Sequence, residues 1–135
     1  MTKQDLQSYR QIKREISDIE NTMRELNTQI YSPRIPKLTG MPTAAVTEPG
    51  SPQERAATAL FELREQYFDA IARLHRRAAE IEMTIELLHD PLQRRILRMR
   101  YIDGRSWTSI AHRANISESY ALQVHGFALY AISKK

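Results

Sequence analysis

Apolar residues recur at steps of three or four residues along two long stretches of this chain. The members of the first stretch are Leu6, Tyr9, Ile12, Ile16, Ile19, Met23, Leu26 and Ile30. This spacing places the apolar side chains on one narrow stripe of an α-helix, as in the seam of a coiled coil. The sequence therefore predicts a helix over residues 3–31, whose stripe needs another helix to cover it.

A segment rich in proline separates this stretch from the second one. Proline lacks the backbone N–H and restricts the residue before it, so residues 32–51 are expected to form a loop. Helix restarts at Ser51, whose side chain can accept a hydrogen bond from the N–H of Glu54 while the Glu54 side chain reaches back to Ser51. The second apolar stretch consists of Leu60, Leu63, Tyr67, Ile71, Leu74, Ala78, Ile81, Ile85 and Leu88.

Two such stretches joined by a loop predict an antiparallel helical hairpin over residues 1–89. A hairpin of two helices buries little apolar surface by itself, and most helical stability in proteins comes from packing of the apolar face. We therefore expect the hairpin to associate with a second copy, as a homodimer that forms a four-helix bundle.

The remaining residues, 90–135, carry the signals of three shorter helices. Asp90 precedes Pro91, and this pair suits the cap and the first position of a helix that extends to about Tyr101. Gly104 follows, and a glycine supplies the positive φ that a turn needs. The first of the three helices is therefore expected to end in a turn.

Two further helices follow, with a short turn between them. Ser106 can cap a helix over residues 107–114, and Ser117 can cap the last helix of the chain. Asn115 occupies the turn, and asparagine is one of the few residues besides glycine that tolerate the left-handed region. Two helices joined in this way form a helix-turn-helix. The expected fold is all-α, with a long antiparallel coiled-coil hairpin followed by a C-terminal three-helix helix-turn-helix domain.

Charge is distributed unevenly along the chain. Eight Lys or Arg and two acids follow Asp90, so residues 91–135 carry a formal charge of +6, which leaves −2 for residues 1–90 of a chain whose net charge is +4. A basic segment attached to a slightly acidic one suits a polyanion such as double-stranded DNA. The same charge also fits a solvated basic surface without a partner, and charge alone leaves both interpretations open.

The last helix has one apolar face and one face open to a partner. Its apolar positions are Ala121, Val124, Ala128 and Ile132. If this helix enters the major groove of DNA, the candidates for reading bases are Glu118, Ser119, Tyr120, Leu122 and Gln123. Gln123 can make two hydrogen bonds to adenine, Glu118 can accept from cytosine, and Leu122 can touch a thymine methyl group.

Four residues close to this helix are candidates for phosphate contacts, which position a protein on DNA without reading its sequence. They are Arg105, Thr108, Arg113 and Ser117. Ser117 is expected to serve first as the helix cap. Trp107 is expected to lie in the core rather than to act as a stacking platform.

The C-terminal segment resembles a known class of DNA-binding module. The stretch LQRRILRMRYIDGRSWTSIAHRANISESYALQVHGFALYAI, residues 92–132, is similar to the C-terminal helix-turn-helix of sigma factors, their region four. The shared features are an Arg-rich first helix, an Ile-Ala pair, and a Ser-capped helix that ends in Ala128, Leu129 and Ile132. With RYIDG, the SW pair and His125, the segment also resembles phage transcriptional regulators of the ArpU/RinA type.

This resemblance covers roughly residues 90–133 and has functional implications. It implies DNA binding and the regulation of phage or prophage genes inside the host cell. Two positions depart from the usual helix-turn-helix pattern, because Asn115 replaces the usual glycine and Ala121 replaces a larger β-branched residue. Neither departure is expected to break the geometry of the two helices.

Two other functions remain open. A small terminase subunit for DNA packaging also combines a helix-turn-helix with helical oligomerisation, although it usually places the DNA module first. Alternatively, the chain is a coiled-coil adaptor whose helix-turn-helix binds a protein such as RNA polymerase. Sequence-dependent DNA binding would favour the regulator over the adaptor, and ring-sized oligomers would favour the terminase subunit.

No sequence feature supports an enzyme, a cofactor site or a membrane protein. There is no glycine-rich phosphate loop, and the four histidines lack the spacing with acids that a zinc site needs, so neither cofactor nor metal is expected. No apolar run approaches the roughly 20 residues of a membrane helix, and residues 1–11 lack the apolar core of a signal peptide. With no cysteine in the chain, these features predict a cytoplasmic protein.

Overall fold

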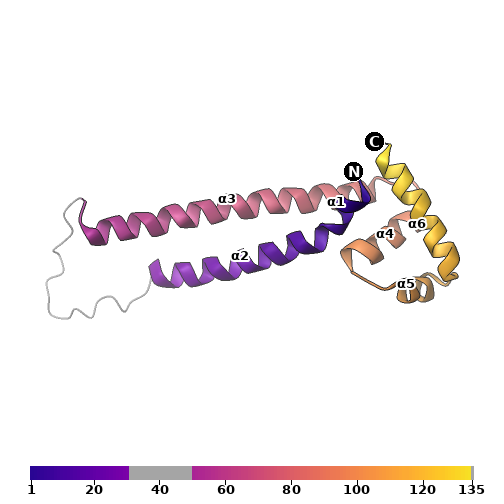
Figure 1. Cartoon of the computed structure of the whole chain (residues 1–135), viewed down its shortest axis with the longest axis horizontal. Coiled ribbons are helices and arrows are strands. Elements are labelled where there is room, and N and C mark those ends of the chain that lie inside the picture. Colours follow the sequence, from indigo (N-terminus) through magenta and orange to yellow (C-terminus); the bar gives the residue numbers. More distant parts are fainter. Residues whose placement is uncertain (31–49, 135) are drawn as a thin grey trace. The chain divides into compact units, whose positions relative to one another are not determined.

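A computed structural model describes residues 1–30 and 50–134, and the described chain is helical without a strand (Figure 1). The helices are α1 (Lys3–Gln7), α2 (Tyr9–Ile30), α3 (Pro52–Glu86), α4 (Pro91–Leu97), α5 (Trp107–Ala114) and α6 (Glu118–Ser133), with a π-helical turn at Arg98–Ile102. The expected all-α class is confirmed. The loop expected over residues 32–51 lies outside the described residues, apart from Gly50 and Ser51.

The chain divides into two compact units. One unit combines residues 1–15 with residues 74–135, and the other comprises residues 16–73. The expected division at residue 90 was drawn from the end of the second apolar stretch and the helix start at Asp90, and it stays a prediction. The first unit includes both ends of the expected hairpin segment because they are bonded to each other, as in the ion pair of 2.5 Å between Asp5 and Arg77.

The helix expected over residues 3–31 is interrupted near its start. α1 ends at Gln7, and the Ser8 hydroxyl donates a hydrogen bond of 2.6 Å to the carbonyl of Asp5. A serine hydroxyl that bonds to a nearby carbonyl competes with regular helix, and this explains why α2 starts anew at Tyr9. The expectation of one unbroken helix was therefore wrong at this position.

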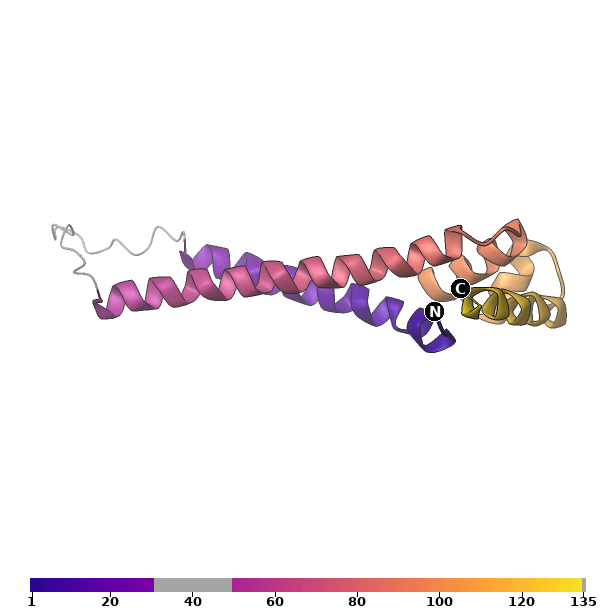
Figure 2. The same ribbon diagram turned by 90° about the horizontal axis from the view of Figure 1, so that it is seen from above.

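In the unit of residues 16–73, the two apolar stripes differ in burial. Ile16, Met23 and Leu26 of α2 are buried, whereas Leu60 and Tyr67 of α3 are only half-buried. Figures 1 and 2 show these parts of α2 and α3 running alongside each other. Further large apolar side chains of α3 are exposed in this unit, namely Phe61, Leu63 and Phe68. The stripe of α3 is therefore incompletely covered.

The start of α3 shows the expected cap with one difference. The Ser51 hydroxyl accepts from the N–H of Glu54 at 3.1 Å, as the sequence predicts. The carboxylate of Glu54 accepts from the N–H of Gly50 at 3.0 Å, one residue before the expected Ser51. Both bonds satisfy backbone donors close to the start of the helix.

The C-terminal helices pack around one apolar cluster. Its buried members are Ile96, Met99, Ile110, Ala121 and Val124, and Leu92, Trp107, Ala114 and Ile116 pack against them. The caps that the sequence predicts for these helices are all present. Asp90 accepts from the N–H of Leu92 at 2.9 Å and caps α4. Gly104 has a φ of 72°, as expected for the turn that follows.

The helix that begins at Pro91 ends differently from the expectation. α4 stops at Leu97, and a π-helical turn continues to Ile102, where the N–H of Asp103 donates to the carbonyl of Arg98 at 3.0 Å. A π-helical turn contains an extra residue and changes the direction of the side chains that follow. Met99 and Tyr101 in this turn are both buried, and Met99 belongs to the apolar cluster whereas Tyr101 bonds to His125.

Candidate nucleic-acid interface

Short-range hydrogen bonds fix the connection between α5 and α6. Asn115 adopts the left-handed conformation with a φ of 59°, as the sequence predicts, and ends α5. The N–H of Ile116 donates to the carbonyl of Ala111 at 3.0 Å. Ser117 then caps α6 by accepting from the N–H of Tyr120 at 3.1 Å. These bonds satisfy backbone groups at both helix ends and define the direction in which α6 leaves the turn.

The two faces of α6 differ sharply in exposure. Ala121, Val124, Ala128 and Ile132 are buried, which confirms the apolar face expected from the sequence. The five candidates for base reading are all exposed: Glu118, Ser119, Tyr120, Leu122 and Gln123. A helix of this kind has its inner face anchored and its outer face free for a partner.

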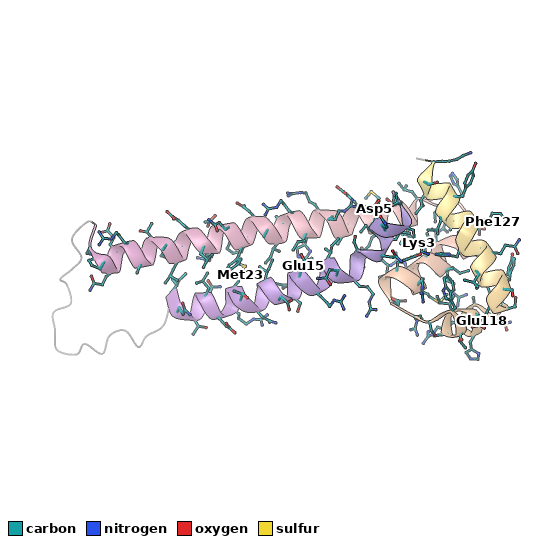
Figure 3. The ribbon with its side chains drawn as sticks, viewed as in Figure 1. Lys3, Asp5, Glu15, Met23, Glu118 and Phe127 are labelled. Atoms are coloured by element: carbon teal, nitrogen blue, oxygen red, sulfur yellow. The ribbon has the colours of Figure 1, made fainter. Side chains whose placement is uncertain are left out.

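One hydrogen bond connects a base-reading candidate to a phosphate candidate. The hydroxyl of Thr108 on α5 donates to the Glu118 carboxylate on α6 at 2.7 Å. Glu118 lies at the start of α6 (Figure 3), so this bond orients its carboxylate while leaving the group exposed. Thr108 therefore positions Glu118, a role that the sequence analysis did not assign to it.

The other phosphate candidates differ in how free their side chains are. Arg105 is half-buried, and its Nε lies 3.9 Å from the Asp103 carboxylate, which offsets part of its charge. Arg113 is exposed, and its side chain forms no ion pair within the described residues. Its backbone carbonyl accepts from the Arg95 guanidinium at 2.8 Å. Arg113 is therefore the cation of this set that is most available to a phosphate.

Large apolar side chains also lie on the exposed surface of α6. Tyr120 and Leu122 are 47% and 48% exposed, and Phe127 and Tyr130 are 57% and 62% exposed. Phe127 extends from the outer side of α6 in Figure 3. The sequence analysis placed Tyr120 and Leu122 on the surface open to a partner, and the structure confirms their exposure. Such a surface can contact either bases or the apolar surface of another protein.

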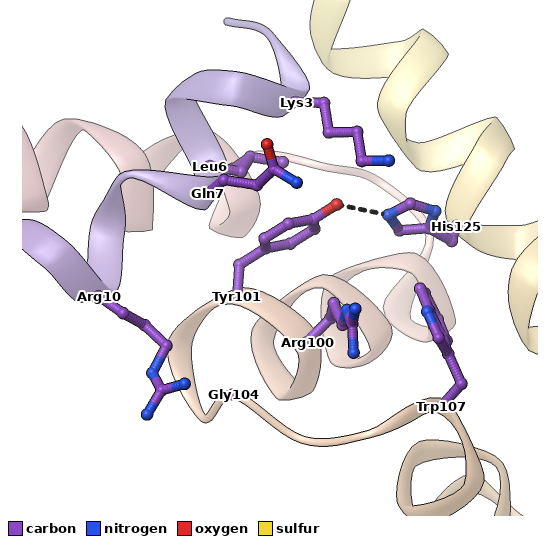
Figure 4. Close-up of a pocket in the computed structure, with 9 residues that line it drawn as sticks. All are labelled: Lys3, Leu6, Gln7, Arg10, Arg100, Tyr101, Gly104, Trp107 and His125. Atoms are coloured by element: carbon purple, nitrogen blue, oxygen red, sulfur yellow. Dashed lines mark hydrogen bonds between the residues drawn. The ribbon is translucent and has the colours of Figure 1, made fainter.

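A buried polar pair is the main feature that sequence reasoning missed. His125 is only 7% exposed, and its Nε2 lies 2.7 Å from the hydroxyl of Tyr101 (Figure 4). The Trp107 ring meets the imidazole edge-on, with ring centroids 4.8 Å apart. The Arg100 guanidinium lies over the Trp107 ring, 4.9 Å from its centroid. Trp107 is half-buried and packs against the core, in agreement with its expected role.

The surroundings of His125 keep it neutral. Burial lowers the pKa of its imidazole to about 4, and the positive charges of Lys3 and Arg100 contribute to this shift. Burial also raises the pKa of the Tyr101 hydroxyl. A neutral imidazole and a protonated tyrosine can share a hydrogen bond without a buried charge. The signal available in the sequence was the spacing of His125, four residues after Ala121 and three before Ala128, on the apolar face.

The described residues show no site for a metal ion and no membrane span. No group of three or more His, Asp or Glu side chains in residues 1–30 and 50–134 is arranged to hold a metal ion. Within the same ranges, each helix is too short or too polar to cross a lipid bilayer.

Comparison of the chain with known protein families, with curated proteins and with solved structures found no match. The resemblance to sigma-factor region four and to phage regulators therefore remains a prediction from the residues that carry it.

Proposed function

We propose that this chain is a sequence-specific DNA-binding regulator of transcription, of phage or prophage genes, that reads the major groove with α6. The observation that carries the proposal is the exposure of Glu118, Ser119 and Gln123 on a helix whose opposite face is buried. A recognition helix needs this combination, because its side chains must reach base edges while the rest of the domain holds the helix still.

The chemistry of the exposed residues agrees with base reading. The Gln123 amide can make two hydrogen bonds to adenine, the oriented carboxylate of Glu118 can accept from cytosine, and Leu122 can contact a thymine methyl group. Arg113 supplies a cation for the phosphate backbone, at the end of the helix that precedes the turn. Residues 91–135 carry the formal charge of +6 that gives such a domain its general attraction to DNA.

The proposal includes a homodimer formed through the helical segment of residues 1–89. The exposed Phe61, Leu63 and Phe68 of α3 and its half-buried stripe support it, because a second copy would cover this apolar surface. Dimers of helix-turn-helix proteins bind two half-sites with matching symmetry. The preferred DNA is therefore expected to contain two related half-sites.

A second candidate function has one observation in its favour. Phe127 and Tyr130 remain exposed in the second half of α6, beyond the residues that a major groove would contact. Aromatic side chains of this kind are common at the centres of protein–protein interfaces. The alternative is an adaptor whose α6 binds a protein such as RNA polymerase.

Selection of bound fragments from a random library of duplex DNA tests the proposal directly. The regulator predicts enrichment of one sequence, with two related half-sites when the full chain is used. Gln123→Ala is the test variant, and Gln66→Ala, on the exposed surface of α3, is its matched control. Enrichment that changes with Gln123→Ala alone supports base reading by α6. Absence of any enriched sequence with the wild-type chain would contradict the regulator and favour the adaptor.

A further inference from the structure

A pocket of about 290 Å³ opens beside the pair formed by Tyr101 and His125, within the unit of residues 1–15 and 74–135 (Figure 4). Three cations line this pocket: Lys3 from α1, Arg10 from α2 and Arg100 from the π-helical turn. Tyr101, Trp107 and His125 form its aromatic walls. No Asp or Glu from the described part of the chain is among its lining residues.

The three cations of the pocket lack acidic partners. Neither Lys3 nor Arg10 nor Arg100 forms an ion pair within residues 1–30 and 50–134. The nearby acids are engaged elsewhere, because Asp5 pairs with Arg77 and Asp103 lies next to Arg105. Positive charges gathered around one space repel each other, and a bound anion would relieve that repulsion.

The backbone of the turn makes room for one of these cations. A Cβ atom added at Gly104 would lie 2.5 Å from an Nη atom of Arg10, so only a glycine allows the guanidinium to lie this close. Arg100 is held in a different way, because it donates to the Arg105 carbonyl at 2.9 Å and lies over the Trp107 ring. Specific contacts thus hold Arg100 at the pocket, and the Arg10 guanidinium lies against the turn beside it.

His125 responds to the same positive charges. Burial is the main cause of its lowered pKa, and Lys3 and Arg100 lower the pKa further. The charged groups at the pocket come from α1, α2 and the π-helical turn, and all of them are cations. An anion bound there would stabilise the protonated imidazole and would therefore raise the pKa of His125.

We propose that this pocket binds a phosphate group through Lys3, Arg10 and Arg100. Guanidinium groups match the geometry of phosphate oxygens and can each donate two hydrogen bonds. The volume of the pocket suits a phosphate or a small phosphate-bearing molecule rather than a large organic ligand. The phosphate comes either from a free molecule or from the DNA backbone. The proposal does not depend on base reading, because none of these residues is a candidate for that role.

The single tryptophan of the chain provides a direct readout, because Trp107 lines the pocket. Its fluorescence is measured at neutral pH during titration with inorganic phosphate, with pyrophosphate and with potassium chloride at equal ionic strength. Phosphate and pyrophosphate are expected to produce a saturable change that chloride does not. Arg10→Gln should weaken pyrophosphate binding about tenfold, because it removes charged hydrogen bonds. Lys13→Gln, which removes an exposed cation of α2 outside the pocket, should bind as wild type.

A second measurement on the wild-type chain makes the test independent of the variants. The pKa of His125, followed by NMR, should rise when pyrophosphate is added. A short DNA duplex then identifies the source of the phosphate: if the duplex changes Trp107 fluorescence and pyrophosphate competes, the group belongs to the backbone. If phosphate and pyrophosphate change the fluorescence but the duplex does not, the ligand is a small molecule. The proposal is overturned if none of these probes produces a saturable change, if the pKa of His125 stays constant, or if Arg10→Gln and Lys13→Gln weaken binding equally.

Discussion

The hydroxyl of Tyr101 lies 2.7 Å from Nε2 of His125 and joins the π-helical turn to α6 in the interior of one unit. Both side chains are buried, so each depends on the other for its hydrogen bond. Tyr101→Phe should therefore destabilise the protein by about 1–3 kcal/mol, because it leaves a buried ring nitrogen without a partner. Denaturant unfolding measures this change. Tyr130→Phe, at an exposed position of α6, is the matched control and should leave the free energy of unfolding unchanged.

Stability should depend on pH through His125. Its pKa is lowered from 6.5 to about 4 in the folded protein, so the unfolded chain binds a proton more readily in this range. The contribution of neutral His125 is fully present above pH 6.5 and is lost as the pH falls from 6.5 towards 4. Denaturation midpoints measured across this range should fall with pH. His125→Gln should flatten that dependence, whereas His112→Gln, at an exposed position of α5, should preserve it.

Gly104 and Gly126, in the unit of residues 1–15 and 74–135, should respond to alanine in opposite ways. Gly104→Ala places a Cβ atom at a φ of 72° and against Arg10, so it should destabilise the protein by about 1–2 kcal/mol. Gly126 lies inside α6 with open space around the added Cβ, and Gly126→Ala should stabilise by about 0.5–1 kcal/mol. Thermal unfolding of both variants checks the signs. A Gly104→Ala protein as stable as the wild type would contradict the left-handed conformation of this turn.

Self-association should depend on the exposed apolar residues of α3. Phe68→Asp should dissociate the proposed dimer without unfolding the chain, because the side chain is 46% exposed. Ile16→Asp should also dissociate it, but by disrupting a buried position of α2. Sedimentation at micromolar concentration measures the assembly, with Phe127→Asp on α6 as the control. A wild-type monomer would rule out the dimer, and a ring of many copies would favour the terminase subunit.

DNA binding should depend on salt through phosphate contacts. Arg113→Ala should weaken binding to all sequences and reduce the slope of log affinity against log salt by about one unit. Lys13→Ala removes the same charge from α2 and should change the slope less. Titration of a labelled duplex at several salt concentrations measures both. An affinity that does not change with salt would contradict DNA binding altogether.

Base specificity should depend on the exposed face of α6. Gln123→Ala should lose about 1–3 kcal/mol of discrimination at one base position while keeping its nonspecific affinity. Competition between the preferred site and single-base variants measures this loss. If Gln123→Ala, Glu118→Ala and Ser119→Ala all retain the wild-type preference, α6 does not read bases and the adaptor becomes the better description.

The sequence by itself determined the features that depend on neighbouring residues. Asp90, Ser106 and Ser117 cap helices, and Asn115 takes the left-handed conformation, because caps and turns are decided within three or four residues. The buried face of α6 was predicted from helical periodicity, which is also a pattern of residues three or four positions apart. The exposure of Gln123 and its neighbours is the consequence of that face being buried.

Tertiary structure alone decided the features that join distant residues. The pairing of His125 with Tyr101 and the pocket shared by Lys3, Arg10 and Arg100 appear in no local pattern. Their free energies come from packing and charge between residues far apart in the chain, and periodicity describes only one helix at a time. A histidine on an apolar face becomes a buried partner only when folding brings a tyrosine hydroxyl to it.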